Sequence, residues 1–254
     1  MARRYAIRQD AAPVAPISGI DYRTALNEEQ YAAVSSEPGP ALVIAGAGSG
    51  KTRTLTYRVA WLLDHGTDPW NILLLTFTNK AAREMTERVR SLIPLDLSRL
   101  WSGTFHSIAN RILRQHAEYL GYTPAFTIMD SDDRKSMIKS VVKSLKLDEK
   151  STRFPKPEVL SSLFSLADNE GANIRETQEN AYPYLSNHLD AILEVHDQYV
   201  ARKQETNSMD FDDLLLNVVR LFQEQEHLRA LYGSRFQHIL SLIHISEPTR
   251  HLRI

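Results

Sequence analysis

The sequence predicts an α/β fold with a parallel sheet that carries an inserted, mostly helical subdomain. Two apolar runs, 41–44 and 72–77, are each followed by a helical pattern, and a weaker strand pattern at 100–104 is followed by another. Strands that alternate with helices in this way are typical of a parallel sheet. Between Asp130 and about Leu231 the pattern is mostly helical instead, which indicates an insertion into the α/β part.

The composition is ordinary for a folded globular chain of 254 residues, with 43% hydrophobic and 24% charged residues. The net charge of −1 neither indicates nor excludes a nucleic-acid partner, because the position of the charges decides this. The chain has no cysteine, which excludes disulfides and thiol catalysis and fits a reducing compartment. No apolar run approaches the roughly 18 residues of a membrane helix. We therefore expect a cytoplasmic protein without a membrane partner.

The N-terminal residues 1–20 are rich in Ala, Pro and Arg and predict a flexible basic tail. The first helix begins after Asn27, a good N-cap, and Gln30 follows three residues later as in a capping box. A second interpretation is that Gln30 presents its side-chain amide to an adenine edge, because an amide can donate and accept at once. The residues around Gln30 favour the capping box.

A glycine-rich loop lies between the first predicted strand, 41–44, and a helix predicted over 53–63. Its glycines allow the backbone to curl around an anion, and the helix N-terminus adds positive potential. Lys51 can reach β- and γ-phosphates, and the Thr52 hydroxyl suits Mg²⁺. The alternative is a turn that binds nothing. The candidate nucleotide-binding residues of the loop are Ala45, Gly46, Ala47, Gly48, Ser49, Gly50, Lys51 and Thr52, with Ala45 standing where the strict pattern has glycine.

Two turns with aromatic residues follow the second and third predicted strands, at the sheet edge where ligands of open α/β sheets gather. Hydroxyls and helix N-termini can bind phosphate there, and an exposed ring can stack on a base of single-stranded nucleic acid. The stretch 76–116 has a local charge of +4. The alternative is that Phe77 and Phe105 are core residues. The candidate DNA-binding residues are Phe77, Thr78, Asn79, Thr104, Phe105 and His106.

Four further helices are predicted, three of them within the proposed insertion. Asp130 caps a helix that runs to Leu145, and Pro157 begins another that ends near Gly171, a plausible C-cap. The remaining two are predicted over 188–205 and from Asp210 to about residue 225.

The order of these motifs resembles the UvrD/Rep/PcrA group of superfamily 1 DNA helicases. The resemblance rests on Gln30, the glycine-rich loop with Arg53, the stretch 75–85, the turn 103–107 and the segment 209–215. It implies a RecA-like ATPase domain, called 1A, over 21–115 and 208–240, with a helical subdomain, called 1B, inserted over 116–207. It further implies ATP-driven movement along single-stranded DNA with 3′-to-5′ unwinding of duplex DNA, in DNA repair or replication.

The resemblance also assigns roles to single residues. It implies that Gln30 contacts adenine, which reverses the preference for a capping role alone, and that Arg53 lies beside the nucleotide. Lys51 and Thr52 become the catalytic pair of the phosphate loop, with Thr52 holding Mg²⁺ through ATP. The motifs that line the DNA channel contribute Phe77, Asn79, Thr104 and His106, beside Thr78 and Phe105 from the same turns.

The chain departs from the family pattern after the strand expected at 236–240. The family continues there with Val-Asp-Glu-Tyr-Gln-Asp, whereas residues 241–254 contain no Asp-Glu pair, and Glu247 is followed by Pro248. The acids that support Mg²⁺ and orient the attacking water are therefore missing. Residues 241–254 resemble translated sequencing-adapter DNA, so we expect a non-native tail and a helicase fragment truncated before the Walker B motif and the second RecA-like domain.

Two functions follow from different classes. The first is an ATP-dependent DNA helicase and ATP hydrolase, present here as an N-terminal part. The second is a nucleotide- and single-stranded-DNA-binding module without hydrolysis or unwinding. A nucleotide kinase is a weaker third alternative, because it would need neither the Phe77 and Phe105 turns nor the helical insertion. Protein partners are not indicated by the sequence.

Overall fold

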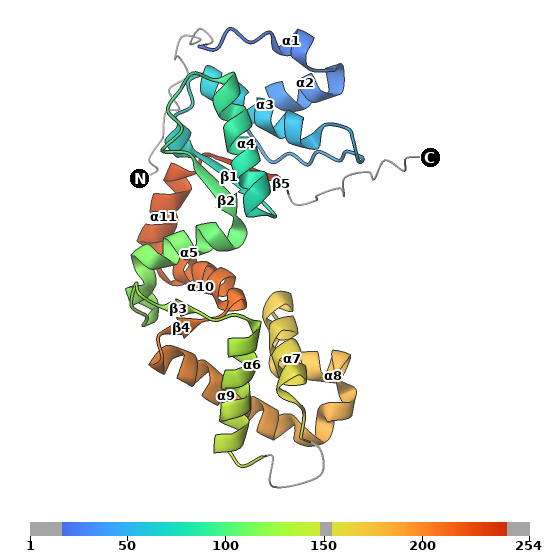
Figure 1. The fold of residues 1–254 in the computed structure, drawn as a ribbon, viewed down its shortest axis with the longest axis vertical. Coiled ribbons are helices and arrows are strands. Elements are labelled where there is room, and N and C mark those ends of the chain that lie inside the picture. Colours follow the sequence, from blue (N-terminus) through green and yellow to red (C-terminus); the bar gives the residue numbers. More distant parts are fainter. Residues whose placement is uncertain (1–16, 148–153, 243–254) are drawn as a thin grey trace, which may run out of the picture. The chain divides into compact units, whose positions relative to one another are not determined.

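The computed structural model describes residues 17–147 and 154–242, and their contacts divide the chain into two compact units (Figure 1). The first unit comprises described residues 17–108 and 229–242, and the second comprises described residues 109–147 and 154–228. Most of the predicted tail, 1–16, and most of the predicted non-native segment, 243–254, lie outside the described residues.

The centre of the first unit is a three-stranded parallel sheet, which confirms the predicted α/β class. The strand order is β2-β1-β5, and Thr76 at the end of β1 pairs with Thr104 of β2 and with Leu242 of β5. All five residues of β1 are buried, as expected for a central strand covered on both faces. The strands are β1 (Ile72–Thr76), β2 (Trp101–Thr104) and β5 (His238–Leu242).

Helices α3 and α4 pack against each other and against this sheet, and α2 packs on α3 (Figure 1). The Thr78 hydroxyl begins α4 by accepting a hydrogen bond from the Ala81 N–H at 3.1 Å. The core between these helices and β1 contains Val59, Leu63, Ile72, Leu74, Met85 and Val89. The elements are α1 (Tyr22–Ala25), α2 (Glu28–Ser35), α3 (Lys51–Asp64), η1 (Pro69–Asn71) and α4 (Asn79–Leu92).

The predicted buried strand at 41–44 is wrong. This segment has no regular secondary structure, and Leu42, Val43 and Ile44 are 83%, 59% and 89% exposed. An apolar run supplies the side chains of a buried strand, but its backbone also needs a neighbouring strand to pair with. Within the described residues, the ladders of this sheet join only β2, β1 and β5, so the run stays outside the core.

The end of the predicted tail is fixed in place. The backbone N–H groups of Ile17 and Ser18, which the sequence assigns to the tail, donate to the buried Asp64 carboxylate at 3.0 and 2.8 Å. Asp64 ends α3 inside the core, and a buried carboxylate needs hydrogen-bond donors, which these residues supply. At the other end, Ser241 and Leu242 belong to β5, two residues beyond the predicted boundary at 240.

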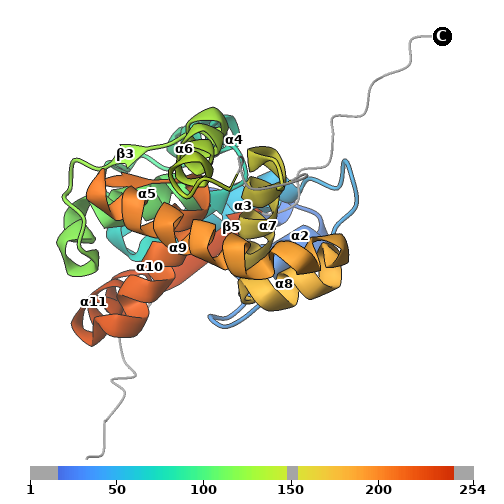
Figure 2. The same cartoon turned by 90° about the horizontal axis from the view of Figure 1, so that it is seen from below.

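The second unit is mostly helical, and Figure 2 shows α6, α7, α8 and α9 grouped around one core. Predicted helix signals mark α6, which Asp130 caps, and α7, which begins at Pro157 and is followed by its C-cap Gly171 with φ of 63°. Helix α8 is a further finding, and Asn173 caps it. The core contains Ile138, Val141, Leu160, Leu163, Phe164, Ile192 and Val195. The helices are α6 (Ser131–Ser144), α7 (Pro157–Glu170), α8 (Ile174–Ala181), η3 (Pro183–His188), α9 (Leu189–Glu205) and α10 (Phe211–Glu224).

A buried group of charges joins α6, α9 and α10, and we call Arg134, Lys203, Asp210, Asp212 and Asp213 the ion cluster. The Lys203 ammonium lies 2.7 Å from both Asp213 carboxylate oxygens and 3.2 Å from an Asp210 oxygen. Arg134 donates to Asp212 at 2.5 Å. Arg134, Lys203 and Asp210 are 7%, 4% and 2% exposed. Charges buried to this degree need partners, so the cluster fixes α10 against its neighbours.

The two units divide at 108/109 and 228/229, whereas the sequence-based proposal divides the chain at 115/116 and 207/208. Helix α10 accounts for the difference at the second border, because it contacts α7, β4 and η2 and so belongs to the helical unit. The elements that complete the chain are α5 (Phe105–His116), η2 (Ala117–Leu120), β3 (Thr127–Ile128), β4 (Ser208–Met209) and α11 (Glu226–Arg235), with β3 and β4 forming a parallel pair.

Candidate functional site

The glycine-rich loop lies directly before α3 in the first unit. Gly48 and Gly50 have φ of 77° and 83°, the left-handed region that favours glycine. Gly50 is the N-cap of α3, and among the described residues no side chain caps this helix. The N–H groups of the first turn, and the positive end of the helix dipole, are therefore available to an anion held by the loop.

The Lys51 ammonium is held by the loop that precedes it. It donates to the carbonyl oxygens of Ala45 at 3.1 Å and Gly46 at 2.8 Å. The Ser49 hydroxyl also donates to the Gly46 carbonyl, at 2.7 Å. A phosphate in the loop would offer Lys51 a full negative charge in place of two carbonyl dipoles, and charge-assisted hydrogen bonds are the stronger kind. The loop therefore places the ammonium where an anion can recruit it.

Gln30 contacts both its own helix and the loop. Its Oε1 accepts from the Asn27 N–H at 3.3 Å, and its N–H donates to Asn27 Oδ1 at 2.8 Å, which is the predicted capping box. Its Nε2 also donates to the Ser49 carbonyl at 2.9 Å. A Cβ added at Gly50 would lie 2.8 Å from this Nε2, so the end of the Gln30 side chain would have to shift. The adenine contact of Gln30 stays a prediction.

Arg53 and Thr52 occupy the first turn of α3. The Arg53 guanidinium donates to the Ala25 carbonyl at 2.7 Å and lies over the Tyr57 ring, 5.2 Å from its centroid. Arg53 thus ties the end of α1 to α3, an interaction that the sequence pattern does not reveal. Thr52 is half-buried, and its carbonyl accepts from the Thr56 hydroxyl at 2.8 Å. The roles of both residues toward a nucleotide stay predictions.

Phe77 and Phe105 are exposed side chains at the carboxyl ends of neighbouring strands. Each follows one member of the Thr76–Thr104 pair that ends the β1–β2 ladder. Phe77 is 72% exposed and Phe105 is 42% exposed, so the alternative that both are core residues is wrong. Exposed rings at adjacent strand ends are suited to stacking on bases.

The polar candidates in these turns hold the backbone. Thr78 caps α4, and Asn79 is the first residue of that helix. The Thr104 hydroxyl accepts from the Ser107 N–H at 3.2 Å, which orders the start of α5. His106 follows Phe105 in the first turn of α5 and is half-buried. The turns therefore present their aromatic rings from a fixed backbone.

The stretch with a local charge of +4 does not act as one basic surface. Arg99 lies 3.2 Å from Asp68, and Arg90 lies 2.5 Å from Glu87 on the same helix. Arg114 belongs to the second unit, where it donates to the Pro124 carbonyl at 2.6 Å. On α4, three exposed cations remain candidates for the predicted DNA contact: Lys80, Arg83 and Arg88.

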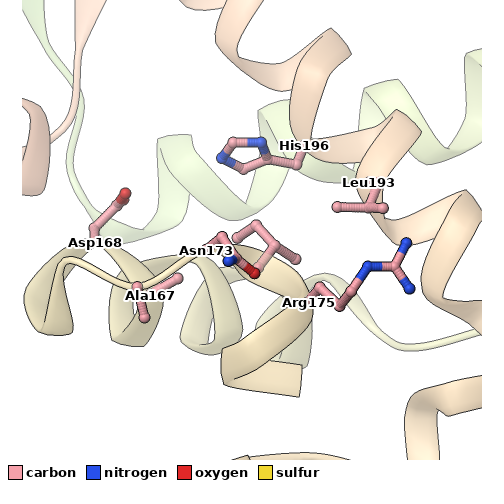
Figure 3. A pocket seen from close by; sticks show the side chains of 8 residues that line it. Ala167, Asp168, Asn173, Arg175, Leu193 and His196 are labelled. Atoms are coloured by element: carbon pink, nitrogen blue, oxygen red, sulfur yellow. The ribbon is translucent and has the colours of Figure 1, made fainter. Parts of the chain in front are cut away.

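The second unit contains a cavity of about 440 Å³ between α7, α8 and α9. Figure 3 shows Asp168 and His196 directed toward the same space, with Arg175 on the far side of Asn173. Burial raises the pKa of Asp168 to about 6, although the Lys203 charge opposes this shift. The folded state therefore holds this proton more tightly than the unfolded chain, and the free energy of unfolding falls as the pH rises through about 6. Burial lowers the pKa of His196. None of the residues predicted to bind nucleotide or DNA lines this cavity.

Within residues 17–147 and 154–242, no group of three or more His, Asp or Glu side chains is placed to hold a metal ion. In the same ranges, no helix has the length and apolar character needed to cross a membrane.

The chain has clear relatives among known proteins. Residues 26–241 match the family described as the UvrD/REP helicase N-terminal domain. The chain is 40% identical over 215 residues to the ATP-dependent DNA helicase PcrA of Staphylococcus aureus (strain NCTC 8325 / PS 47), and equally to that of Staphylococcus epidermidis (strain ATCC 12228 / FDA PCI 1200). These alignments cover 84% of this chain and 29% of each relative.

Proposed function

The chain belongs to the UvrD/REP helicase family, and from this membership we propose that it forms the nucleotide- and DNA-binding part of an ATP-dependent DNA helicase. In this proposal the first unit is a RecA-like ATPase domain, and the second is the helical subdomain inserted into it. The longer protein would move 3′-to-5′ along single-stranded DNA and unwind duplex DNA in the cytoplasm. The family model, which describes an N-terminal domain, and the covered share of 29% support the view that these residues correspond to an N-terminal part.

The observation that carries the nucleotide half of the proposal is the uncapped start of α3 beside the Lys51 ammonium. A triphosphate fits this arrangement, because first-turn N–H groups and one cation converge on the loop. Gly48 and Gly50 give the loop its curvature, Lys51 would bind phosphate, and Thr52 would share a magnesium ion with it. Magnesium supplies charge neutralisation on the phosphates, and the side chain of Gln30 would meet the base.

The DNA half of the proposal rests on Phe77 and Phe105. Their rings are exposed at adjacent strand ends, and the cations Lys80 and Arg83 follow on the exposed face of α4. Stacking on rings beside backbone-contacting cations binds single strands with little sequence preference. A helicase needs this lack of preference, because it must move along any sequence.

We further propose that this chain binds ATP but does not turn it over above background. Strand β5 ends at Leu242, and the residues that follow in the sequence, Ile243-His244-Ile245-Ser246, contain no acid. Phosphoryl transfer depends on a group that positions the attacking water and on charges that stabilise the transferring phosphoryl. Without the Asp-Glu pair that the resemblance implies here, binding should persist while turnover falls. The chain itself would then act as a binding module, which is the alternative function.

Phe77→Ala is expected to weaken the binding of single-stranded DNA by roughly 5- to 150-fold, because one base–aromatic stack is worth about 1–3 kcal/mol. Fluorescence anisotropy of a labelled oligonucleotide, in the presence of a non-hydrolysable ATP analogue, measures the loss. Tyr184→Ala provides a matched control, because Tyr184 is 69% exposed in the second unit. Equal affinity of the Phe77 variant and the wild type would contradict the proposed DNA path.

A further inference from the structure

The far end of α3 holds the segment that carries Gln30. Asp64, the last residue of α3, is fully buried, and its carboxylate accepts four hydrogen bonds from residues 17–22. The donors are the N–H groups of Ile17 at 3.0 Å and Ser18 at 2.8 Å, the Ser18 hydroxyl at 2.5 Å and the Tyr22 hydroxyl at 2.6 Å. A buried carboxylate surrounded by donors from one short segment fixes that segment in place.

The charge state of Asp64 agrees with this geometry. Burial alone raises the pKa of a carboxyl group, but the hydrogen bonds from Ser18, Tyr22 and Ile17 outweigh it and hold the pKa of Asp64 below its ordinary value. The ionised form is therefore favoured in the folded state, and it can accept from all four donors at once.

Contacts along α3 continue the attachment from Asp64 toward the phosphate loop. The Tyr22 ring packs edge-on against Trp61, with centroids 5.0 Å apart, and Tyr31 of α2 packs against the same ring at 6.0 Å. Nearer the loop, Arg53 donates to the Ala25 carbonyl at 2.7 Å. The segment 17–31 is thus attached to α3 near both ends of the helix.

Gln30 lies where this attached segment meets the loop, donating to the Ser49 carbonyl at 2.9 Å. Its position relative to the phosphates depends on where α1 and α2 rest on α3. With 14 residues in α3, Asp64 sits about 20 Å along the helix from Lys51. Asp64 can therefore affect the nucleotide only through the placement of this segment.

We propose that Asp64 is a positioning residue that holds Gln30 in register with the phosphate loop and thereby sets the preference of the site for adenine over other bases. The proposal rests on the proposed nucleotide-binding function. A side-chain amide can accept from the adenine N6 amino group while it donates to N7, whereas guanine presents two acceptors, O6 and N7, at the same edge. Base preference therefore requires a correctly placed amide, whereas triphosphate binding requires only the loop and Lys51.

The test compares three probes, each with Mg²⁺: ATP, GTP and inorganic tripolyphosphate. Their affinities are measured by competition against a fluorescent ATP analogue for the wild type, Asp64→Asn and Gln30→Ala. Asp64→Asn is expected to lower the affinity for ATP roughly five- to tenfold and to leave the affinity for tripolyphosphate unchanged. The ratio of ATP affinity to GTP affinity should fall to the value found for Gln30→Ala. The double variant should be no weaker for ATP than Gln30→Ala alone.

Two further variants keep the test informative if Asp64→Asn folds poorly. Tyr22→Phe retains the buried ring and removes one of the four donors. It should therefore lower the affinity for ATP, and not that for tripolyphosphate, by a smaller factor than Asp64→Asn does. Glu84→Gln is the matched control, because it changes an exposed carboxylate on α4 to an amide. It should not change the affinity for ATP.

A parallel loss of ATP and tripolyphosphate affinity, or an unchanged ATP-to-GTP preference in both Asp64→Asn and Tyr22→Phe, would overturn the positioning role. Failure of the proposed function itself looks different. In that case Lys51→Ala would not reduce the binding of ATP or of tripolyphosphate relative to the wild type. The positioning role of Asp64 would then be refuted together with the proposed function.

Discussion

Lys51→Ala will weaken the binding of Mg·ATP to this chain by roughly 10- to 150-fold, since a hydrogen bond to a charged group is worth about 1.5–3 kcal/mol. The ammonium is the cation that the loop itself holds, bonded to the carbonyls of Ala45 and Gly46. Its removal leaves the N–H groups of the loop and of α3 as the remaining anion ligands. Isothermal titration calorimetry with Mg·ATP measures the change.

A matched control separates this effect from the loss of one positive charge. Lys139→Ala removes the same charge from an exposed position on α6 in the second unit. Its affinity for Mg·ATP should equal that of the wild type. The role of the loop would be refuted if Lys51→Ala and Lys139→Ala bound the nucleotide equally well.

Lys203→Met will lower the free energy of unfolding by about 3–5 kcal/mol, the cost of leaving a buried charge without its partner. Lys203 is 4% exposed and is the cation bonded to both Asp210 and Asp213. Methionine fills much of the same space but leaves the Asp213 carboxylate without this ammonium, while Asp210 keeps the Arg134 guanidinium at 3.7 Å. The midpoint of denaturant unfolding should fall accordingly.

The cause can be isolated by a second change. Asp213→Asn removes one of the two carboxylates, so the double variant Lys203→Met/Asp213→Asn should recover part of the loss, which is a test of direct coupling. Lys139→Met is the exposed control and should change stability by less than about 0.5 kcal/mol. A loss below 1 kcal/mol in Lys203→Met would mean that the ion cluster contributes little to the fold.

Local signals in the sequence predict the elements that depend on local chemistry. The glycines of the loop, the Asn27 cap and the Asp130 cap all act within four residues, and each is found in the structure as expected. The apolar residues of β1 are buried because strands lie on both sides of it. The residues 41–44 are also apolar, but they have no neighbouring strand to pair with and are exposed. The apolar character of a segment alone therefore does not distinguish a buried strand from an exposed loop.

Interactions between distant residues escape this kind of prediction. Asp64 ends α3 as an unremarkable acid, and its partners lie 42 to 47 residues away, two of them backbone N–H groups with no sequence signal. The segment at 210–213 predicts a helix start, which the structure has, but not the burial of its charges beside Arg134 and Lys203. Only the fold brings these partners together.

Steady-state ATP turnover by this chain, with and without single-stranded DNA, tests the account most directly. We predict that Mg·ATP binds but that turnover stays at the background of the Lys51→Ala variant and is not stimulated by DNA, because no Asp-Glu pair follows β5. DNA-stimulated turnover that is lost in Lys51→Ala would contradict this, and would mean that other residues position the attacking water.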